Sequence, residues 1–165
     1  MSIVDTVLHK VFGTPHERKV KQLRPIIAEI NKAREALETL DDEALAAKSA
    51  EFRKKLADGA TLDDIRVEAF AVCKEACDRR LGIFNIFKPE NNFDFSRLGP
   101  ELQDAINKAK EELASGKNEW EVFMPAAVYA KVRELYPESV KPFRMMPFDV
   151  QMIGGLVLHE GAIAD

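Results

Sequence analysis

The first half of the sequence carries three helix-start signals, each followed by apolar residues at helical spacing. Thr14–Glu17 (TPHE) combines a threonine N-cap, a proline at the first helical position and a glutamate at the capping-box position. Asp41 or Asp42 is placed to cap a second helix, and Thr61 a third. A chain that begins this way buries its apolar surface by packing helix on helix, so the fold class is predicted to be mainly α. The helices are expected over residues 14–40, 41–58 and 61–82.

The apolar side chains of these helices are predicted to face a shared core, and their Asp and Glu side chains to lie on outer faces. Pro25 removes one hydrogen bond from the first helix, so a bend or a division into two pieces is expected there. The inward residues are predicted to be Leu23, Ile26, Ile27, Ile30, Leu37 and Leu40, then Leu45, Phe52 and Leu56, and finally Leu62, Ile65, Ala69, Val72, Cys73 and Ala76.

The composition is that of a globular chain with an uneven charge. With 165 residues, 46% hydrophobic and 32% charged, it can bury one core of ordinary size, with or without an appendage. The net charge is −4, but residues 1–24 hold five Lys or Arg against two acidic residues, +3, which leaves −7 for the remainder. This balance argues against general nucleic-acid binding. No apolar run or leader pattern suggests a membrane span or secretion, so a cytoplasmic location is expected.

The amino-terminal segment is amphipathic and basic. Ile3, Val4, Val7, Leu8, Val11 and Phe12 recur at helical spacing before Gly13, and Arg18, Lys19, Lys21 and Arg24 follow. Two interpretations stay open: a helix docked on the core, or one that meets anionic lipid or a partner. Cys73 and Cys77 lie four residues apart without histidines at a matching spacing, so they are expected to be free thiols with no metal.

The composition changes between Ile83 and Arg144. Phe84, Phe87, Phe93 and Phe95 occur among turn-forming residues. Helices are predicted over 100–115 and 125–136, with a short strand possible at 120–123. This segment is either a docking module or a helical excursion packed on the rest of the chain.

The last segment, Met145–Asp165, reads MMPFDVQMIGGLVLHEGAIAD. Pro147 suits the first turn of a helix, which would place Phe148 and Gln151 on one face. A carboxamide both donates and accepts, matching the N6 and N7 edge of adenine. Gly154 and Gly155 suggest a close backbone approach. The simpler alternative is that Gln151 is a surface residue.

The sequence of this segment, together with VFG near the start and EAFAV at 68–72, resembles that of the SecA family of bacterial preprotein translocase ATPases. The resemblance implies that Gln151 reads adenine with Met145 and Phe148 beside the base, and that ATP with Mg²⁺ is the cofactor of the complete protein. It also implies that the basic amino-terminal segment touches anionic membrane at the inner face of the cell membrane and the Sec translocon channel, through which preproteins pass. The residues concerned are Ile3, Val7, Lys10, Val11, Arg18, Lys19 and Lys21.

The resemblance covers residues 1–82 and 145–165, which predicts three segments: an amphipathic helical segment 1–82, a helical insert 83–144 and an adenine-recognition stretch 145–165. By resemblance the chain is the helical amino-terminal portion of a RecA-like (P-loop) motor domain, truncated before its parallel sheet is complete. The sequence holds no G-x-x-x-x-G-K-[ST] loop and no catalytic constellation, so this chain alone is expected neither to hydrolyse ATP nor to bind it tightly.

Two other functions stay in view. The first is a self-standing helical interaction or regulatory module without nucleotide chemistry. The second is the amino-terminal part of a Q-motif nucleic-acid helicase, which the net negative charge and the EAFAV sequence disfavour.

Overall fold

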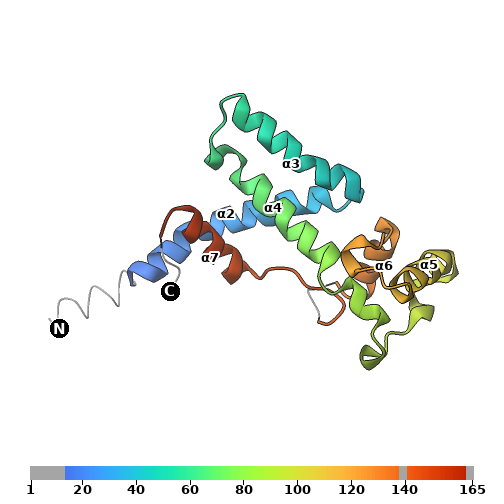
Figure 1. The fold of residues 1–165 in the computed structure, drawn as a ribbon. Coiled ribbons are helices and arrows are strands. Elements are labelled where there is room, and N and C mark those ends of the chain that lie inside the picture. The colour runs from blue at the N-terminus through green and yellow to red at the C-terminus, as the bar shows by residue number, and fades with distance from the viewer. Residues whose placement is uncertain (1–13, 138–140, 163–165) are drawn as a thin grey trace.

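The computed structural model describes residues 14–137 and 141–162, and every regular element within these ranges is helical. The prediction of a mainly α fold is therefore confirmed for the described residues (Figure 1). The possible strand at 120–123 is wrong, because this part of the chain forms a single 3₁₀ turn, Glu119–Glu121. The α-helices are α2 (Pro15–Leu37), α3 (Asp42–Ala57), α4 (Leu62–Arg80), α5 (Gln103–Ala114), α6 (Ala126–Leu135) and α7 (Asp149–His159). Further 3₁₀ turns span Ile83–Phe87, Pro89–Asn91, Phe95–Leu98 and Pro100–Leu102.

The three predicted N-caps are present. The side-chain oxygen of Thr14 accepts from the Glu17 amide at 3.1 Å, that of Asp41 from the Ala44 amide at 2.7 Å, and that of Thr61 from the Asp64 amide at 3.2 Å. Each bond satisfies one amide that the first turn of a helix leaves without a partner. The expected division at Pro25 is wrong, since α2 continues as one helix to Leu37.

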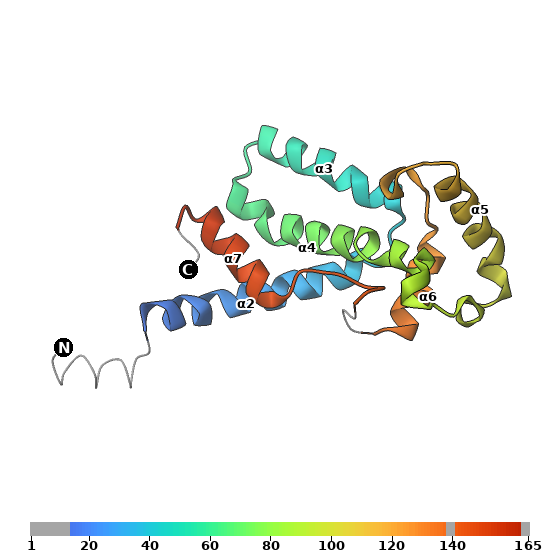
Figure 2. The same ribbon diagram turned by 60° about the horizontal axis from the view of Figure 1, so that its bottom comes forward.

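Four helices form the first core. α2 and α4 lie along one another, α3 packs on another side of α4, and α7 returns to cover the amino-terminal half of α2 (Figures 1 and 2). α7 also approaches α4 closely, because a Cβ added at Gly155 would lie 3.0 Å from Cε1 of Phe70. The close approach expected for the glycine pair is thus present at Gly155. The buried side chains of this core are Leu23, Ile27, Ile30, Leu37, Leu45, Ala71, Met152 and Leu156.

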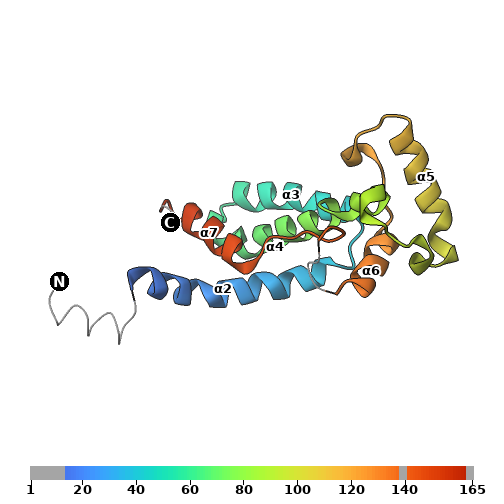
Figure 3. The same cartoon turned by 90° about the horizontal axis from the view of Figure 1, so that it is seen from below.

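A second core is built entirely from residues 83–143. We call residues 83–144 the 83–144 unit; it lies beyond the carboxyl end of α4, at the opposite end of the molecule from the start of α2 (Figure 3). Its aromatic side chains interlock, with the rings of Phe93 and Phe143 edge to face at 4.9 Å. The buried residues are Ile83, Phe84, Ile86, Phe93, Leu98, Ile106, Ala109, Val122, Met124, Val128, Tyr129, Val132 and Phe143.

The buried face of α4 differs from the predicted one. Leu62, expected inside, is 60% exposed, and Cys73 is also exposed. Lys74, Glu75, Asp78 and Arg79 are buried instead. The expectation that carboxylates lie on outer faces is therefore wrong for Glu75 and Asp78, because α4 has neighbours on several sides and its polar face is covered as well. Among the described helices, none combines the length and apolar character needed to cross a lipid bilayer.

Candidate functional site

The stretch singled out by the sequence, Met145–Gln151, leads into α7. Phe148 is the N-cap residue of this helix, so Pro147 precedes the helix and its expected place in the first turn is wrong. The side-chain oxygen of Gln151 accepts from the backbone N–H of Phe148 at 2.8 Å, which brings the two predicted site residues together. Phe148 is 58% exposed and Gln151 is exposed too. The carboxamide oxygen keeps a second lone pair, so the cap does not prevent it from accepting from a ligand.

Met145 lies against the carboxyl end of α4. A Cβ added at Gly82 would be 2.7 Å from the carbonyl oxygen of Pro142 and 3.1 Å from Cγ of Met145, and Gly82 has a φ of +91°. The Asn85 side chain donates to the same Pro142 oxygen at 2.7 Å. Only glycine suits this position, because any Cβ would push the returning chain away.

Arg144, immediately before Met145, is buried and forms a two-pronged pair with Asp78 of α4. Its Nε lies 3.1 Å from Oδ1 and its Nη2 lies 2.7 Å from Oδ2. The third nitrogen, Nη1, donates to the carbonyl oxygen of Tyr136 at 2.7 Å, just after α6. Two parallel charge-assisted bonds fix both the distance and the plane of the guanidinium.

The other end of the stretch is held by Lys74. Its Nζ lies 2.7 Å from Oδ1 of Asn31 in α2 and 3.3 Å from Oδ1 of Asp149, the first residue of α7. Asn31 also donates to Asp149 at 3.3 Å. Lys74 and Asp78 are four residues apart on α4 and so share one face. One face of α4 therefore anchors the chain on both sides of Phe148.

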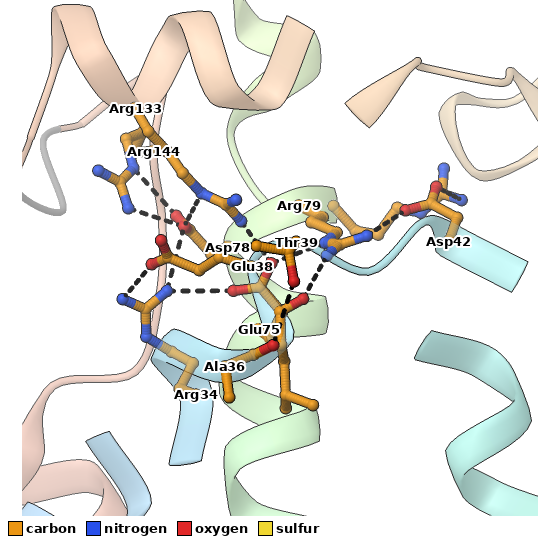
Figure 4. A network of polar contacts seen from close by, with 12 residues as sticks. Arg34, Ala36, Glu38, Thr39, Asp42, Glu75, Asp78, Arg79, Arg133 and Arg144 are labelled. Carbon is orange, nitrogen blue, oxygen red and sulfur yellow. Dashed lines mark hydrogen bonds and ion pairs between the residues drawn. The ribbon is translucent and has the colours of Figure 1, made fainter. Parts of the chain in front are cut away.

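The Arg144–Asp78 pair belongs to a larger arginine–carboxylate network (Figure 4). Asp78 Oδ2 also accepts from Arg133 Nε of α6 at 3.1 Å. The Glu75 carboxylate forms ion pairs with Arg79 at 2.7 Å, with Arg34 at 3.1 Å and with Arg133. The network joins α2, α3, α4 and α6 to the segment that carries Arg144. Its members are Arg34, Glu38, Asp42, Glu75, Asp78, Arg79, Arg80, Arg133 and Arg144.

The network holds five arginines and four carboxylates, so each carboxylate has at least one cation as a partner. Burial alone would raise the pKa of Asp78, but the hydrogen bonds and charges of Arg144 and Arg133 outweigh burial and hold that pKa below its ordinary value. The carboxylate therefore stays ionised at neutral pH and exchanges no proton there. Such a group fixes geometry and does not serve as an acid or base.

A cavity of about 880 Å³ lies between α2 and α7. Its walls include Ile27, Ile153 and Val157, with Lys19 and Arg24 also lining it. Met145, Phe148 and Gln151 are not among its lining residues.

The basic residues predicted to meet a membrane or partner are only partly described. Lys19 pairs with Glu160 of the segment after α7, whereas Arg18 and Lys21 are exposed. Ile3, Val7, Lys10 and Val11 lie outside the described residues.

Asp78, Arg133 and Arg144 were not predicted as site residues. A usable signal exists in α4, where the small residues Ala71 and Ala76 are followed by the charged pairs Lys74-Glu75 and Asp78-Arg79. A helix whose apolar stripe is this weak is rarely buried by apolar contacts alone.

Comparison with known proteins gives a consistent result. The family model for the SecA DEAD-like domain matches residues 8–94 and 90–165. Proteins named "Protein translocase subunit SecA" are similar to the chain: that of Sorangium cellulosum is 33% identical over 158 residues, covering 96% of this chain and 10% of the relative. That of Chromobacterium violaceum is 49% identical over 97 residues, 59% of this chain and 10% of the relative. That of Syntrophotalea carbinolica is 32% identical over 161 residues, 98% of this chain and 11% of the relative.

The chain thus spans about a tenth of the length of these relatives. No solved structure matches the chain significantly.

Proposed function

This chain belongs to the SecA family, and from that premise we propose that Met145–Gln151 is the adenine-recognition stretch of an ATP-driven motor that exports preproteins through the Sec channel. In this proposal the helices described above are the amino-terminal portion of a RecA-like (P-loop) motor domain. One observation carries it: an exposed aromatic ring and a carboxamide sit together at the start of α7, on a stretch that α4 anchors at both ends.

The chemistry of the pair suits a purine. The exposed face of Phe148 offers an apolar surface to a flat ring, and the Gln151 amide supplies one donor and one acceptor to the adenine edge. Met145, held against Gly82, is placed on the same stretch. Preorganisation matters here, because a stretch already fixed in position loses less conformational freedom when a ligand binds.

The phosphates of ATP need other groups. Residues 1–165 contain no phosphate-binding loop with its lysine and magnesium-binding hydroxyl, and those groups supply most of the affinity in P-loop motors. This chain alone is therefore expected not to hydrolyse ATP and to bind it no more tightly than the millimolar range, on the order of 4 kcal/mol. ATP with Mg²⁺ would act in the longer motor.

The amino-terminal residues are proposed to hold the motor on the inner face of the cell membrane, from the cytoplasm. Arg18 and Lys21 are exposed and can face anionic lipid or the Sec channel, and in the sequence they follow the apolar residues Ile3, Val7 and Val11 and the cation Lys10. The net charge of −4 supports a role without nucleic acid.

The test is the base preference of the longer motor. Gln151→Ala is expected to cost about 1 to 3 kcal/mol in preference for ATP over GTP, the usual worth of a two-point amide contact with a base. Titration with both nucleotides measures it. Because Gln151 also caps α7, Gln151→Glu is the matched control: it keeps an acceptor for the Phe148 amide but cannot donate to adenine N7.

Both variants should lose adenine preference, and only Gln151→Ala should weaken the cap. An unchanged ratio of ATP to GTP affinity in both would remove Gln151 from the site. Micromolar ATP binding by the 165-residue chain would refute the argument about the phosphates.

A self-standing helical interaction module is the second candidate. It is favoured by one observation, that the cavity of about 880 Å³ between α2 and α7 is not lined by Gln151. If the longer protein binds no nucleotide in the same titration, this candidate takes the place of the first.

A further inference from the structure

We propose that Asp78 is a positioning residue through which the 83–144 unit controls the placement of Met145–Phe148. The consequence for nucleotide binding rests on the proposed function above, whereas the mechanical coupling rests on the contacts alone. The unit would then act as a regulator of the adenine site, engaged when α6 is docked on α4 and released when α6 moves away.

The first step is that one carboxylate serves two arginines from different parts of the molecule. Oδ2 of Asp78 lies 3.1 Å from Nε of Arg133, which belongs to α6, and 2.7 Å from Nη2 of Arg144, which precedes Met145. Asp78 is buried, so neither arginine can be replaced by bulk water without a cost. The docking of α6 and the anchoring of Arg144 therefore depend on the same group.

The second step is that Arg144 is held from both sides. Its Nε and Nη2 bond Asp78 on α4, and its Nη1 donates to the Tyr136 carbonyl at the end of α6. If α6 leaves α4, Arg144 loses the Tyr136 carbonyl even when it keeps Asp78. Movement of α6 thus reaches Arg144 by two routes.

The third step is that Arg144 and Lys74 anchor the two ends of the stretch through different elements. The contact of Lys74 with Asp149 lies beyond Phe148 and involves α2 and α4 but not α6. Releasing Arg144 should therefore loosen the chain before α7 while the helix stays packed on its apolar side. The effect is predicted to be local, and this separates coupling from general destabilisation.

The experiment measures amide hydrogen exchange of the 165-residue chain without nucleotide. In Arg133→Met, exchange of the Phe148, Gln151 and Met152 amides, all bonded within the cap of α7, is expected to rise about tenfold relative to the parent. Two amides report on the rest of the molecule: Leu45 in α3 and Glu160 after α7. They should rise far less.

The matched control is Lys131→Met, which removes from the same helix a cation whose one ion-pair partner within residues 14–137 and 141–162 is Glu134 of α6. It should leave the Phe148 and Met152 amides unchanged. Arg133→Lys keeps the charge without the fork that reaches both Asp78 and Glu75, so a rise of about threefold is expected. If Arg133→Met does not fold, Arg133→Lys is compared with Lys131→Arg instead.

A rise equal at Leu45 and at Phe148, or no rise at Phe148 in a folded Arg133 variant, overturns the proposal. Because no nucleotide is present, the outcome does not depend on the base preference of Gln151. The coupling between α6 and Arg144 can be correct even if Gln151 does not bind adenine, and Gln151 can bind adenine even if the coupling is absent.

Discussion

Tyr129 shows how much a single atom can matter beside the network. Its side chain is buried, and its hydroxyl has no hydrogen-bond partner among the described residues. The Arg79 guanidinium lies over its ring, 5.9 Å from the centroid. A buried hydroxyl without a partner loses its hydration and gains nothing in return, so the ring stabilises the fold and the oxygen does not.

Tyr129→Phe is therefore expected to leave the free energy of unfolding unchanged or to raise it, by up to about 1 kcal/mol. Tyr136→Phe is the control, because the Tyr136 oxygen accepts from Arg97 at 3.2 Å and its loss should lower stability by about 0.5 to 1.5 kcal/mol. Urea unfolding of the three proteins decides. A large loss in Tyr129→Phe would mean that the hydroxyl is bonded after all.

The same hydroxyl should make the free energy of unfolding depend on pH in the alkaline range. Burial raises the pKa of Tyr129 from 10.0 to about 12. A raised pKa means that the folded state keeps the hydroxyl proton at a pH where the unfolded chain has lost it. The free energy of unfolding is therefore unaffected by this group below pH 10 and declines as the pH rises toward 12. In Tyr129→Phe the free energy of unfolding, measured as a function of pH, should decline less over this range than in the parent. The same pH dependence in both proteins would contradict the raised pKa of Tyr129.

At the scale of the element, the junction between α4 and the returning chain depends on Gly82. Gly82 and Gly116 both have a φ of +91°, but a Cβ at Gly116 would meet nothing within 4 Å. Gly116→Ala should therefore show only the backbone cost of positive φ, about 1 kcal/mol. Gly82→Ala adds a clash with the Pro142 carbonyl and should be worse by a further 1 to 3 kcal/mol, roughly the cost of overpacking.

Thermal unfolding of the two variants measures the difference directly. Equal destabilisation would show that residues 142–145 can shift without loss. Because both substitutions share one backbone conformation, their difference isolates the contact with the returning chain.

The elements themselves were largely predictable from sequence. Thr14, Asp41 and Thr61 cap the helices they were expected to cap, since capping depends on residues three positions apart. The buried face of α4 was not predictable in the same way. Asp78 meets Arg133 and Arg144, which are 55 and 66 residues away in the chain, and a periodicity that counts apolar residues gives no weight to such a partner.

The candidate site was predictable in part for the same reason. Phe148 and Gln151 are local partners, and they meet at the start of α7. The error at Pro147 is one of register, since the helix starts two residues later than expected. The anchors Lys74 and Asp78 come from a distant helix and become visible only in three dimensions.

At the scale of the whole molecule, the two cores suggest that the 83–144 unit is separable, and the predicted boundaries at 82/83 and 144/145 can be tested on that basis. Gly82 and Met145 lie in near contact, so a short Gly/Ser linker can replace residues 83–144. We expect α2, α3, α4 and α7 to remain folded, with lower stability because Asp78 loses Arg133 and Arg144 and keeps only the longer contact with Arg34, at 3.9 Å. Circular dichroism and thermal unfolding test this, and loss of the helical signal would place the unit inside the host core.

Membrane association gives a second prediction at this scale. Arg18→Gln and Lys21→Gln should each weaken binding to anionic vesicles about fivefold, from roughly 1 kcal/mol per cation near such a surface. Lys19→Gln is the control, because Lys19 already pairs with Glu160 and should contribute less. Co-sedimentation at two salt concentrations is the measurement, since added salt screens the attraction. Equal binding to neutral vesicles would contradict it.

The near contact of Gly82 with Met145 also has a mechanical consequence. Stretched out, residues 83–144 represent roughly 200 Å of chain. While the Asp78–Arg144 fork is closed, the fork and the Lys74–Asp149 contact share any tension between α4 and α7, and residues 83–144 cannot extend. Opening the fork alone would leave the second core intact. Residues 83–144 could extend only after that core also unfolds. The fork is thus one of the connections through which α4 and α7 bear a load together, and it keeps residues 83–144 from extending under that load.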